Sequence, residues 1–309
     1  MRFAYSRHNQ SIKAQIRAWI EQSRSKGLSV HALLDGSMFS QHDIKRLATA
    51  SIHFSPALLG SPFENLELQG PLFWSMNESD PKKQSIMLRH TDGIPALSLI
   101  ATAKPIESLR ELLVWLAVAH TQDEQKLHCS FADTRVLPSL LHCLKPDQFG
   151  RLGQSMGEWL WITRAGGIET RPFPDQAKQA TQENDAFQLD VGQFDFMLAS
   201  AEADMVFQML AEKMPDLIPD MPPHEIHARI SRLLDTARSH GITDLPELFQ
   251  YAVVGLSTRD DFDTHPAVRN SWERIRREGL SFSTLAEQWP EAFWQAFTLP
   301  DDDTAVDPE

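Results

Sequence analysis

The chain has 309 residues, of which 42% are hydrophobic and 23% are charged, and this is the composition of a folded globular protein. Its formal net charge of −13 disfavours a nucleic-acid-binding protein, because such proteins need concentrated basic residues to displace the counterions of the phosphates. The same acidity gives no attraction to an anionic membrane surface. We therefore expect neither nucleic acid nor a membrane among the partners of this protein.

The N-terminal stretch, residues 1–21, has apolar residues at helical spacing but lacks the continuous apolar core of a signal peptide. No segment approaches the roughly 20 consecutive apolar residues of a membrane span. The chain contains only two cysteines, Cys129 and Cys143, which are too few for a disulfide framework at this length. These features predict a cytoplasmic protein with reduced thiols.

Up to about Ile168, short apolar runs that are typical of strands alternate with helical patterns. The predicted strands are Val30–Asp35, Leu72–Met76, Pro95–Thr102, Lys126–Phe131 and Trp159–Ile162. The predicted helices between them are Gln41–Ala50, Pro81–His90, Pro105–Leu113 and Leu140–Phe149. This alternation predicts an α/β domain over residues 1–170, which we expect to contain a parallel or mixed sheet.

The composition changes between Arg171 and Asp185, where Pro, Gln, Asp and Lys replace the apolar periodicity, so residues 171–186 are the predicted linker. Beyond it only helical patterns follow, which predicts an all-α domain over residues 187–299. Its expected helices are Phe187–Leu210, His224–His240, Leu245–Leu256, Pro266–Glu278 and Phe282–Phe297. The acidic residues 300–309 are expected to form a disordered tail.

Ser155, within Gly153-Gln-Ser-Met-Gly157, matches the pattern of a nucleophile elbow, in which a catalytic serine stands between a strand and the following helix. Here the order is reversed, because a predicted helix precedes Ser155 and a predicted strand follows it. A serine hydrolase that uses Ser155 is therefore an alternative interpretation rather than the leading one.

The sequence His224-Glu-Ile-His227 resembles the helix of a zinc peptidase, but its histidines are three rather than four positions apart. The acidic clusters lack the glycine and the terminal glutamate of a calcium loop, and no phosphate-binding or dinucleotide-binding glycine motif is present. We expect no catalytic residue, no metal site and no cofactor.

Trp159 and Trp161 alternate along one predicted strand and therefore project from the same side of it. Their side chains could form a platform for a binding partner, and packing in the core is the alternative explanation. We include both tryptophans among the candidate partner-binding residues.

The segment Phe131-Ala-Asp-Thr-Arg-Val-Leu137 resembles a characteristic segment of the type VI secretion effector adaptor family, which typically reads Phe-Arg-Phe-Tyr-Asp-Pro-Arg-Val-Leu. Laid without a gap over Cys129–Leu137, the chain matches this pattern at five positions and departs from it at four. The matching residues are Phe131, Asp133, Arg135, Val136 and Leu137. Further family-like segments occur in the expected order at Ala32–Gly36, Leu66–Leu72 and Phe149–Trp159.

The resemblance implies a non-enzymatic cytoplasmic adaptor, or chaperone, that binds a secreted toxin (the effector) and loads it onto the spike protein of the secretion machine. From the residues themselves, Gly36 ends the apolar run Val30–Asp35 and Gly70-Pro71 opens the run from Leu72, so Asp35, Gly36, Gly70 and Pro71 are predicted to form structural turns at strand ends. Asp133 and Arg135 either pair locally to stabilise the turn or face a partner. Arg135 is the better interface candidate, because its planar guanidinium offers several donors. An immunity protein that neutralises a toxin is a further alternative, since it too would be non-catalytic and could be acidic.

Overall fold

The computed structural model describes residues 3–76, 81–173, 186–259 and 261–297. The described chain forms two compact units. The first, the α/β unit, comprises the described residues between Tyr5 and Ala201, and the second, the helical unit, comprises the described residues between Glu202 and Phe297 together with Phe3 and Ala4. The chain therefore passes between the units twice, once after Ala4 and once within a helix after Ala201.

The α/β unit contains a six-stranded sheet with the strand order β2-β3-β1-β4-β7-β8. Its strands are β1 (Ser29–Asp35), β2 (Ser55–Pro56), β3 (Pro71–Ser75), β4 (Leu97–Thr102), β7 (Glu158–Ile162) and β8 (Ile168–Pro172). A smaller sheet has the order β6-β5-β9. It is formed by β5 (Val118–His120), β6 (Lys126–His128) and β9 (Phe187–Gln188).

The expectation of a parallel or mixed main sheet was wrong, because every neighbouring pair in the six-stranded sheet is antiparallel. Helix α3 (Pro81–His90) does connect two strands that run in the same direction, β3 and β4. However, β1 lies between them and is antiparallel to both. A strand–helix–strand pattern in the sequence therefore does not tell whether the two strands become neighbours. The described parallel pairing is that of β5 with β9 in the smaller sheet.

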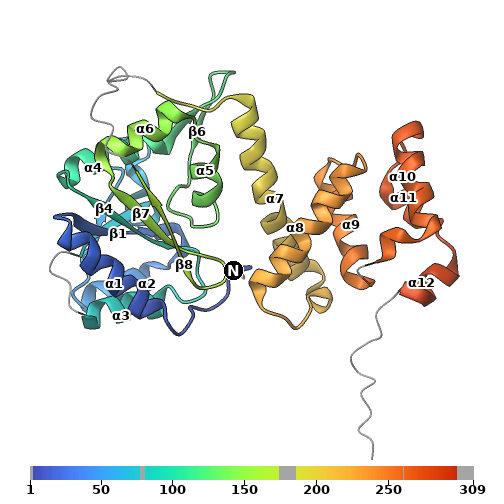
Figure 1. Ribbon diagram of the computed structural model, residues 1–309, viewed down its shortest axis with the longest axis horizontal. Helices are drawn as coiled ribbons and strands as arrows, with labels where there is room; N and C mark the ends of the chain where they lie inside the picture. The colour runs from blue at the N-terminus through green and yellow to red at the C-terminus, as the bar shows by residue number, and fades with distance from the viewer. Residues whose placement is uncertain (1–2, 77–80, 174–185, 260, 298–309) are drawn as a thin grey trace, which may run out of the picture. The chain divides into compact units, whose positions relative to one another are not determined.

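Helices cover both faces of the six-stranded sheet (Figure 1). Alternate residues of β1 point to opposite faces: Leu33 packs with α4, α5 and α6, whereas Ala32 and Leu34 pack with α1, α2 and α3. This double coverage explains why the strands are continuous apolar runs in the sequence. The covering helices are α1 (Ile12–Ser25), α2 (Gln41–Thr49), α3, α4 (Ile106–Ala117), α5 (Leu137–Cys143) and α6 (Pro146–Ser155).

The single helix expected over Leu140–Phe149 is in fact parts of α5 and α6, and the second of these begins at Pro146. Proline is favoured in the first helical turn, where its missing N–H leaves no hydrogen bond unmade. The segment Cys129–Phe131, predicted as strand, lies beyond the end of β6. Cys129 is buried there, and burial raises the pKa of its thiol to about 12.

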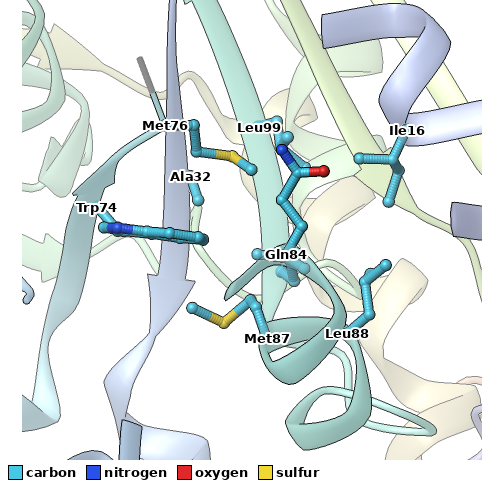
Figure 2. A pocket seen from close by; sticks show the side chains of 9 residues that line it. Ile16, Ala32, Trp74, Met76, Gln84, Met87, Leu88 and Leu99 are labelled. Carbon is cyan, nitrogen blue, oxygen red and sulfur yellow. The ribbon is translucent and has the colours of Figure 1, made fainter. Parts of the chain in front are cut away.

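A small apolar cavity of about 10 Å³ lies on the face of the sheet that α1 and α3 cover (Figure 2). Its lining includes Ile16 of α1, Ala32 of β1 and Trp74 of β3, together with Gln84 and Met87 of α3. A volume of this size holds about one water molecule. The cavity is therefore a packing gap in the core rather than a ligand pocket.

Helix α7 (Val191–Lys213) begins in the α/β unit and ends in the helical unit. The further helices of the helical unit are α8 (Pro223–Ser239), α9 (Leu245–Ser257), α10 (Pro266–Glu278), α11 (Phe282–Ala286) and α12 (Glu291–Phe297). Their core is rich in aromatic rings, with Tyr251 in contact with Phe262, Trp272 and Phe282. The helix predicted over Phe282–Phe297 is interrupted before Pro290, because proline cannot donate a backbone hydrogen bond within a helix.

The predicted linker 171–186 begins inside a strand, because Arg171 and Pro172 belong to β8, and it ends just before Phe187, the first residue of β9. Residues 174–185 of this linker, and all of the predicted tail 300–309, lie outside the described residues. None of the described helices is both long and apolar enough to span a membrane.

Candidate protein-interaction site

Three of the family-like segments, Ala32–Gly36, Leu66–Leu72 and Phe131–Leu137, meet at one end of the six-stranded sheet. The fourth, Phe149–Trp159, enters β7 at the opposite end, where Gly157 N donates to the carbonyl of Ala101 at 2.8 Å. At the first of these ends, the register pairs Asp35, the last residue of β1, with Pro71, the first residue of β3. It also pairs Leu34 with Leu97 at the start of β4, and Ser98 with Trp161 near the end of β7. The turn that contains Asp133 joins this end of the sheet, because Thr134 N donates to the carbonyl of Pro95 at 3.0 Å.

The four predicted turn residues lie together at this end. Asp35 accepts hydrogen bonds from the backbone N and the Oγ of Ser37, at 3.0 and 2.7 Å, and so caps the short 3₁₀ helix Gly36–Met38. Gly36 N donates to the carbonyl of Gly70 at 3.0 Å. A Cβ at position 36 would overlap the carbonyl oxygen of Leu68 and lie 2.6 Å from that of Gly70. The close approach of the two backbones therefore requires glycine at this position.

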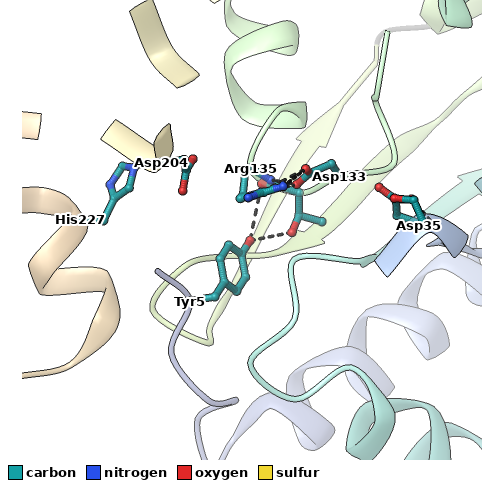
Figure 3. A network of polar contacts seen from close by, with 8 residues as sticks. Tyr5, Asp35, Asp133, Arg135, Asp204 and His227 are labelled. Carbon is teal, nitrogen blue, oxygen red and sulfur yellow. Dashed lines mark hydrogen bonds and ion pairs between the residues drawn. The ribbon is translucent and has the colours of Figure 1, made fainter. Parts of the chain in front are cut away.

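Asp133 and Arg135 pair with each other. Arg135 Nη2 lies 2.7 Å from Asp133 Oδ2, and Arg135 Nε lies 3.1 Å from both carboxylate oxygens (Figure 3). The backbone N of Arg135 also donates to Asp133 Oδ1 at 2.8 Å. Asp133 is buried, whereas the Arg135 side chain keeps 24% of its surface exposed. The carboxylate thus holds the guanidinium in one orientation at the surface of the α/β unit.

Asp35 is a second buried carboxyl group near this ion pair (Figure 3). Burial raises the pKa of Asp35, and the negative charge of Asp133 acts in the same direction. The hydrogen bonds from Ser37 and the positive charge of Arg135 lower the pKa and oppose that rise. This end of the sheet therefore concentrates two carboxylates around one arginine.

The structure places Trp159 and Trp161 in the core and not at a binding surface. Both indoles pack against the α4–α6 side of the sheet, and Trp159 contacts Phe131 with ring centroids 6.3 Å apart. Trp159 Nε1 donates to Ser98 Oγ at 3.0 Å. Because both side chains are buried, they cannot form the exposed binding platform that the sequence suggested. Packing in the core, the alternative explanation, describes both tryptophans.

Ser155 is the last residue of α6, and β7 begins three positions later. The order at this site is helix, turn, strand, which is the reverse of a nucleophile elbow. The main-chain carbonyl of Ser155 accepts a hydrogen bond from Thr102 Oγ1 at 2.6 Å. In the described part of the chain, no three or more His, Cys, Asp or Glu side chains are grouped so that they could hold a metal ion.

Tyr5, which no sequence motif singles out, belongs to this end of the sheet as well. Its hydroxyl lies 2.6 Å from Thr134 Oγ1 and donates to the carbonyl of Ile162 at 2.7 Å. No local pattern around Tyr5 could have indicated this contact, because its partners are far away in the sequence.

A protein-family model described as a domain of unknown function (DUF4123) matches residues 30–151. This family is associated with effector adaptors of the type VI secretion system. The match begins in β1 and ends in α6, so it includes the turns at Gly36 and Gly70 and the Asp133–Arg135 pair. Searches of curated proteins and of solved structures found no match.

Proposed function

We propose that this protein is a cytoplasmic adaptor that binds a type VI secretion effector and loads it onto the spike protein. The observation that carries the proposal is the family match over residues 30–151. Three family-like segments within it, Ala32–Gly36, Leu66–Leu72 and Phe131–Leu137, meet at one end of the sheet. A structural role for these segments and a binding role for the surface they build are compatible. By fixing the turns at this end of the sheet, the segments build the surface that would bind a partner.

The Asp133–Arg135 pair supports a protein-binding role for this surface. A guanidinium that is already held in one orientation loses less conformational entropy when a partner binds to it. Arginine is also enriched among the residues that dominate binding energy at protein interfaces. We therefore expect Arg135 to contact the effector or the spike protein, with Asp133 acting as its positioning residue.

Co-purification of the full-length chain with the effector and the spike protein encoded beside its gene tests this function. We expect both proteins to be retained by the tagged chain. We also expect deletion of the gene to abolish secretion of the effector while resistance to the toxin stays unchanged. Loss of resistance would instead indicate an immunity protein, and binding of neither neighbour would contradict the proposal.

The Arg135→Gln variant tests the surface itself, and Arg259→Gln is its matched control. Like Arg135, Arg259 pairs with an aspartate two positions away along the chain: Arg259 Nη2 lies 3.2 Å from Asp261 Oδ2. Arg259, however, lies in the helical unit. We expect Arg135→Gln to weaken effector or spike binding at least tenfold and Arg259→Gln to leave it unchanged.

The hydrolase alternative is tested by Ser155→Ala. Because Ser155 ends a helix and its carbonyl makes the described hydrogen bond, the loss of its hydroxyl should change neither partner binding nor secretion. Loss of an esterase activity in this variant, with secretion intact, would favour the enzyme.

A further inference from the structure

Strand β8 forms an edge of the six-stranded sheet, because β7 is its only neighbour among the described strands. Its residues from Glu169 to Pro172 are exposed, and Ile168 is half-buried. An exposed edge presents a row of backbone N–H and C=O groups with which another strand can pair. β8 is therefore a candidate surface for the addition of a strand.

The register with β7 shows which backbone groups of β8 face outward. At one end of the pair, Thr163 N donates to the carbonyl of Gly167 at 2.9 Å. At the other end, Phe173 N donates to the carbonyl of Gly157 at 2.9 Å. Hydrogen-bonded and non-hydrogen-bonded residue pairs alternate along an antiparallel ladder, so the odd-numbered residues of β8 bond to β7. The even-numbered residues, Ile168, Thr170 and Pro172, therefore direct their backbone groups away from it.

The outward groups of β8 are matched by an extended backbone. In the described part of the chain, no other hydrogen bond uses the backbone N–H of Ile168 or Thr170. Pro172 has no N–H and contributes only its carbonyl. The edge thus offers two donors and three acceptors at the spacing of a strand, and another strand can satisfy them.

The two charged side chains of β8 indicate which strand fits. Glu169 and Arg171 lie opposite Trp161 and Trp159 in the register, so both project from the face of the sheet that α4, α5 and α6 cover. Neither forms an ion pair with another residue in the part of the chain that the structure describes. The guanidinium carbon of Arg171 lies 4.8 Å from the ring centroid of Phe149, which orders the side chain and leaves its N–H groups able to donate. β8 therefore carries one negative and one positive charge on the same face.

A second copy of β8 presents the complementary pattern. When two copies pair antiparallel about a two-fold axis at Thr170, Glu169 of each copy lies directly opposite Arg171 of the other. Four backbone hydrogen bonds form within the two strands. Two join the Thr170 residues, and two run from the N–H of Ile168 to the carbonyl of Pro172 in the other copy. Opposite charges on directly opposed residues stabilise such a pair.

Charge disfavours the neighbouring registers. A two-fold axis at Glu169 would also allow four backbone hydrogen bonds within β8, but it would place glutamate opposite glutamate. An axis at Arg171 would place arginine opposite arginine, and it would allow only two of these bonds because Pro172 has no N–H. Like charges directly opposite each other are destabilising. The register centred on Thr170 is the one of the three that satisfies both the backbone and the charges.

We propose that this protein forms a two-fold symmetric dimer in which the β8 strands of two copies pair antiparallel and join their sheets into one. This inference goes beyond the proposed function and does not depend on it, since β8 lies outside the family match at residues 30–151. Two short exposed strands bury little surface, so the dimer should be weak and concentration-dependent. Each copy uses its β8 edge once, so assembly by this contact stops at two.

Sedimentation velocity of the full-length protein over a range of concentrations measures the dimer, and a charge swap tests its register. Glu169→Arg and Arg171→Glu each turn both opposite-charge pairs into like-charge pairs, so each should weaken the dimer at least tenfold. An equimolar mixture of these two variants restores both opposite-charge pairs between unlike copies and should recover the dimer. Glu273→Arg makes the same charge change at an exposed position of the helical unit and should leave the dimer unchanged.

The variant Thr170→Pro tests the backbone pairing, and Thr170→Val, which keeps the N–H, is its matched control. Proline is tolerated at a sheet edge where its missing N–H faces solvent, as that of Thr170 does. We expect Thr170→Pro to abolish the dimer, Thr170→Val to retain it, and circular dichroism to show both variants folded.

Three results would overturn the inference. The first is an unaltered protein that stays monomeric at every concentration. The second is a dimer that both single charge variants form as readily as the unaltered protein does. The third is a monomeric unaltered protein whose binding to the effector is lost in Thr170→Pro and kept in Thr170→Val, because that result would assign the β8 edge to a strand of the effector.

Discussion

Tyr5 and Thr134 lie 129 positions apart in the chain, and yet the Tyr5 hydroxyl lies 2.6 Å from Thr134 Oγ1. The Tyr5 hydroxyl has one proton, which it donates to the carbonyl of Ile162 at 2.7 Å. Thr134 Oγ1 is therefore the donor to Tyr5 Oη. These two hydrogen bonds join the N-terminal segment, the turn before α5 and the end of β7.

Replacing Tyr5 with phenylalanine should destabilise the protein by about 1–3 kcal/mol, because two buried groups lose their partner. Urea unfolding of the two proteins measures the difference. Thr134→Val removes one of the same hydrogen bonds, so the double variant should cost less than the sum of the single ones. Strict additivity would show that Tyr5 and Thr134 are not coupled.

Replacing Arg135 with glutamine should destabilise the α/β unit by about 2–3 kcal/mol, because it leaves the buried carboxylate of Asp133 without its charged partner. The combined variant Asp133→Asn/Arg135→Gln should recover part of that loss, since neither charge then remains. Thermal unfolding of the single and double variants measures the coupling. A double variant as unstable as the sum of both single variants would contradict the pairing.

Replacing Gly36 with alanine should cost about 1–3 kcal/mol, because the new Cβ would force apart the backbones at Leu68 and Gly70. Gly192→Ala is the control. Its Cβ would make only an ordinary contact of 3.4 Å with Asp190, and alanine is the better helix former at this position in α7. Chemical denaturation should show the control unchanged or slightly more stable. Equal effects of the two substitutions would contradict the close approach at Gly36.

Asp35 should make the stability of the protein depend on pH. Burial raises the pKa of its carboxyl above the usual range of an aspartate, so the folded state holds the proton more tightly than the unfolded chain does. The ionised form therefore costs stability, and that cost grows as the pH rises from the unfolded pKa through the folded one. It is absent below the unfolded pKa.

The comparison of Asp35→Asn with the unaltered protein isolates this cost. Asparagine keeps an oxygen that can accept the Ser37 hydrogen bonds. The variant should gain stability relative to the unaltered protein as the pH rises above about 4, the unfolded pKa of an aspartate, and the difference should level off once the pH exceeds the folded pKa. Denaturation at a series of pH values measures it. A difference that grows as the pH falls would contradict the raised pKa.

Much of the local structure could be predicted from the sequence, because strands, helix starts and turns depend on nearby residues. Apolar runs gave β1 and β4 nearly to the residue, and helix α10 was predicted with its observed bounds, Pro266–Glu278. The turn residues Asp35 and Gly36 were identified for the same reason, since a glycine ends an apolar run there.

What only the tertiary structure decided is which distant segments meet. The antiparallel sheet depends on β1 lying between β3 and β4, and no periodicity within either strand encodes that order. The burial of Trp159 and Trp161 depends in the same way on the helices that cover their face of the sheet. The pattern of a strand records how apolar its faces are, whereas neighbours and layers arise from contacts between segments that are remote along the chain. The hydroxyl of Tyr5, whose partners are Thr134 and Ile162, is the clearest instance.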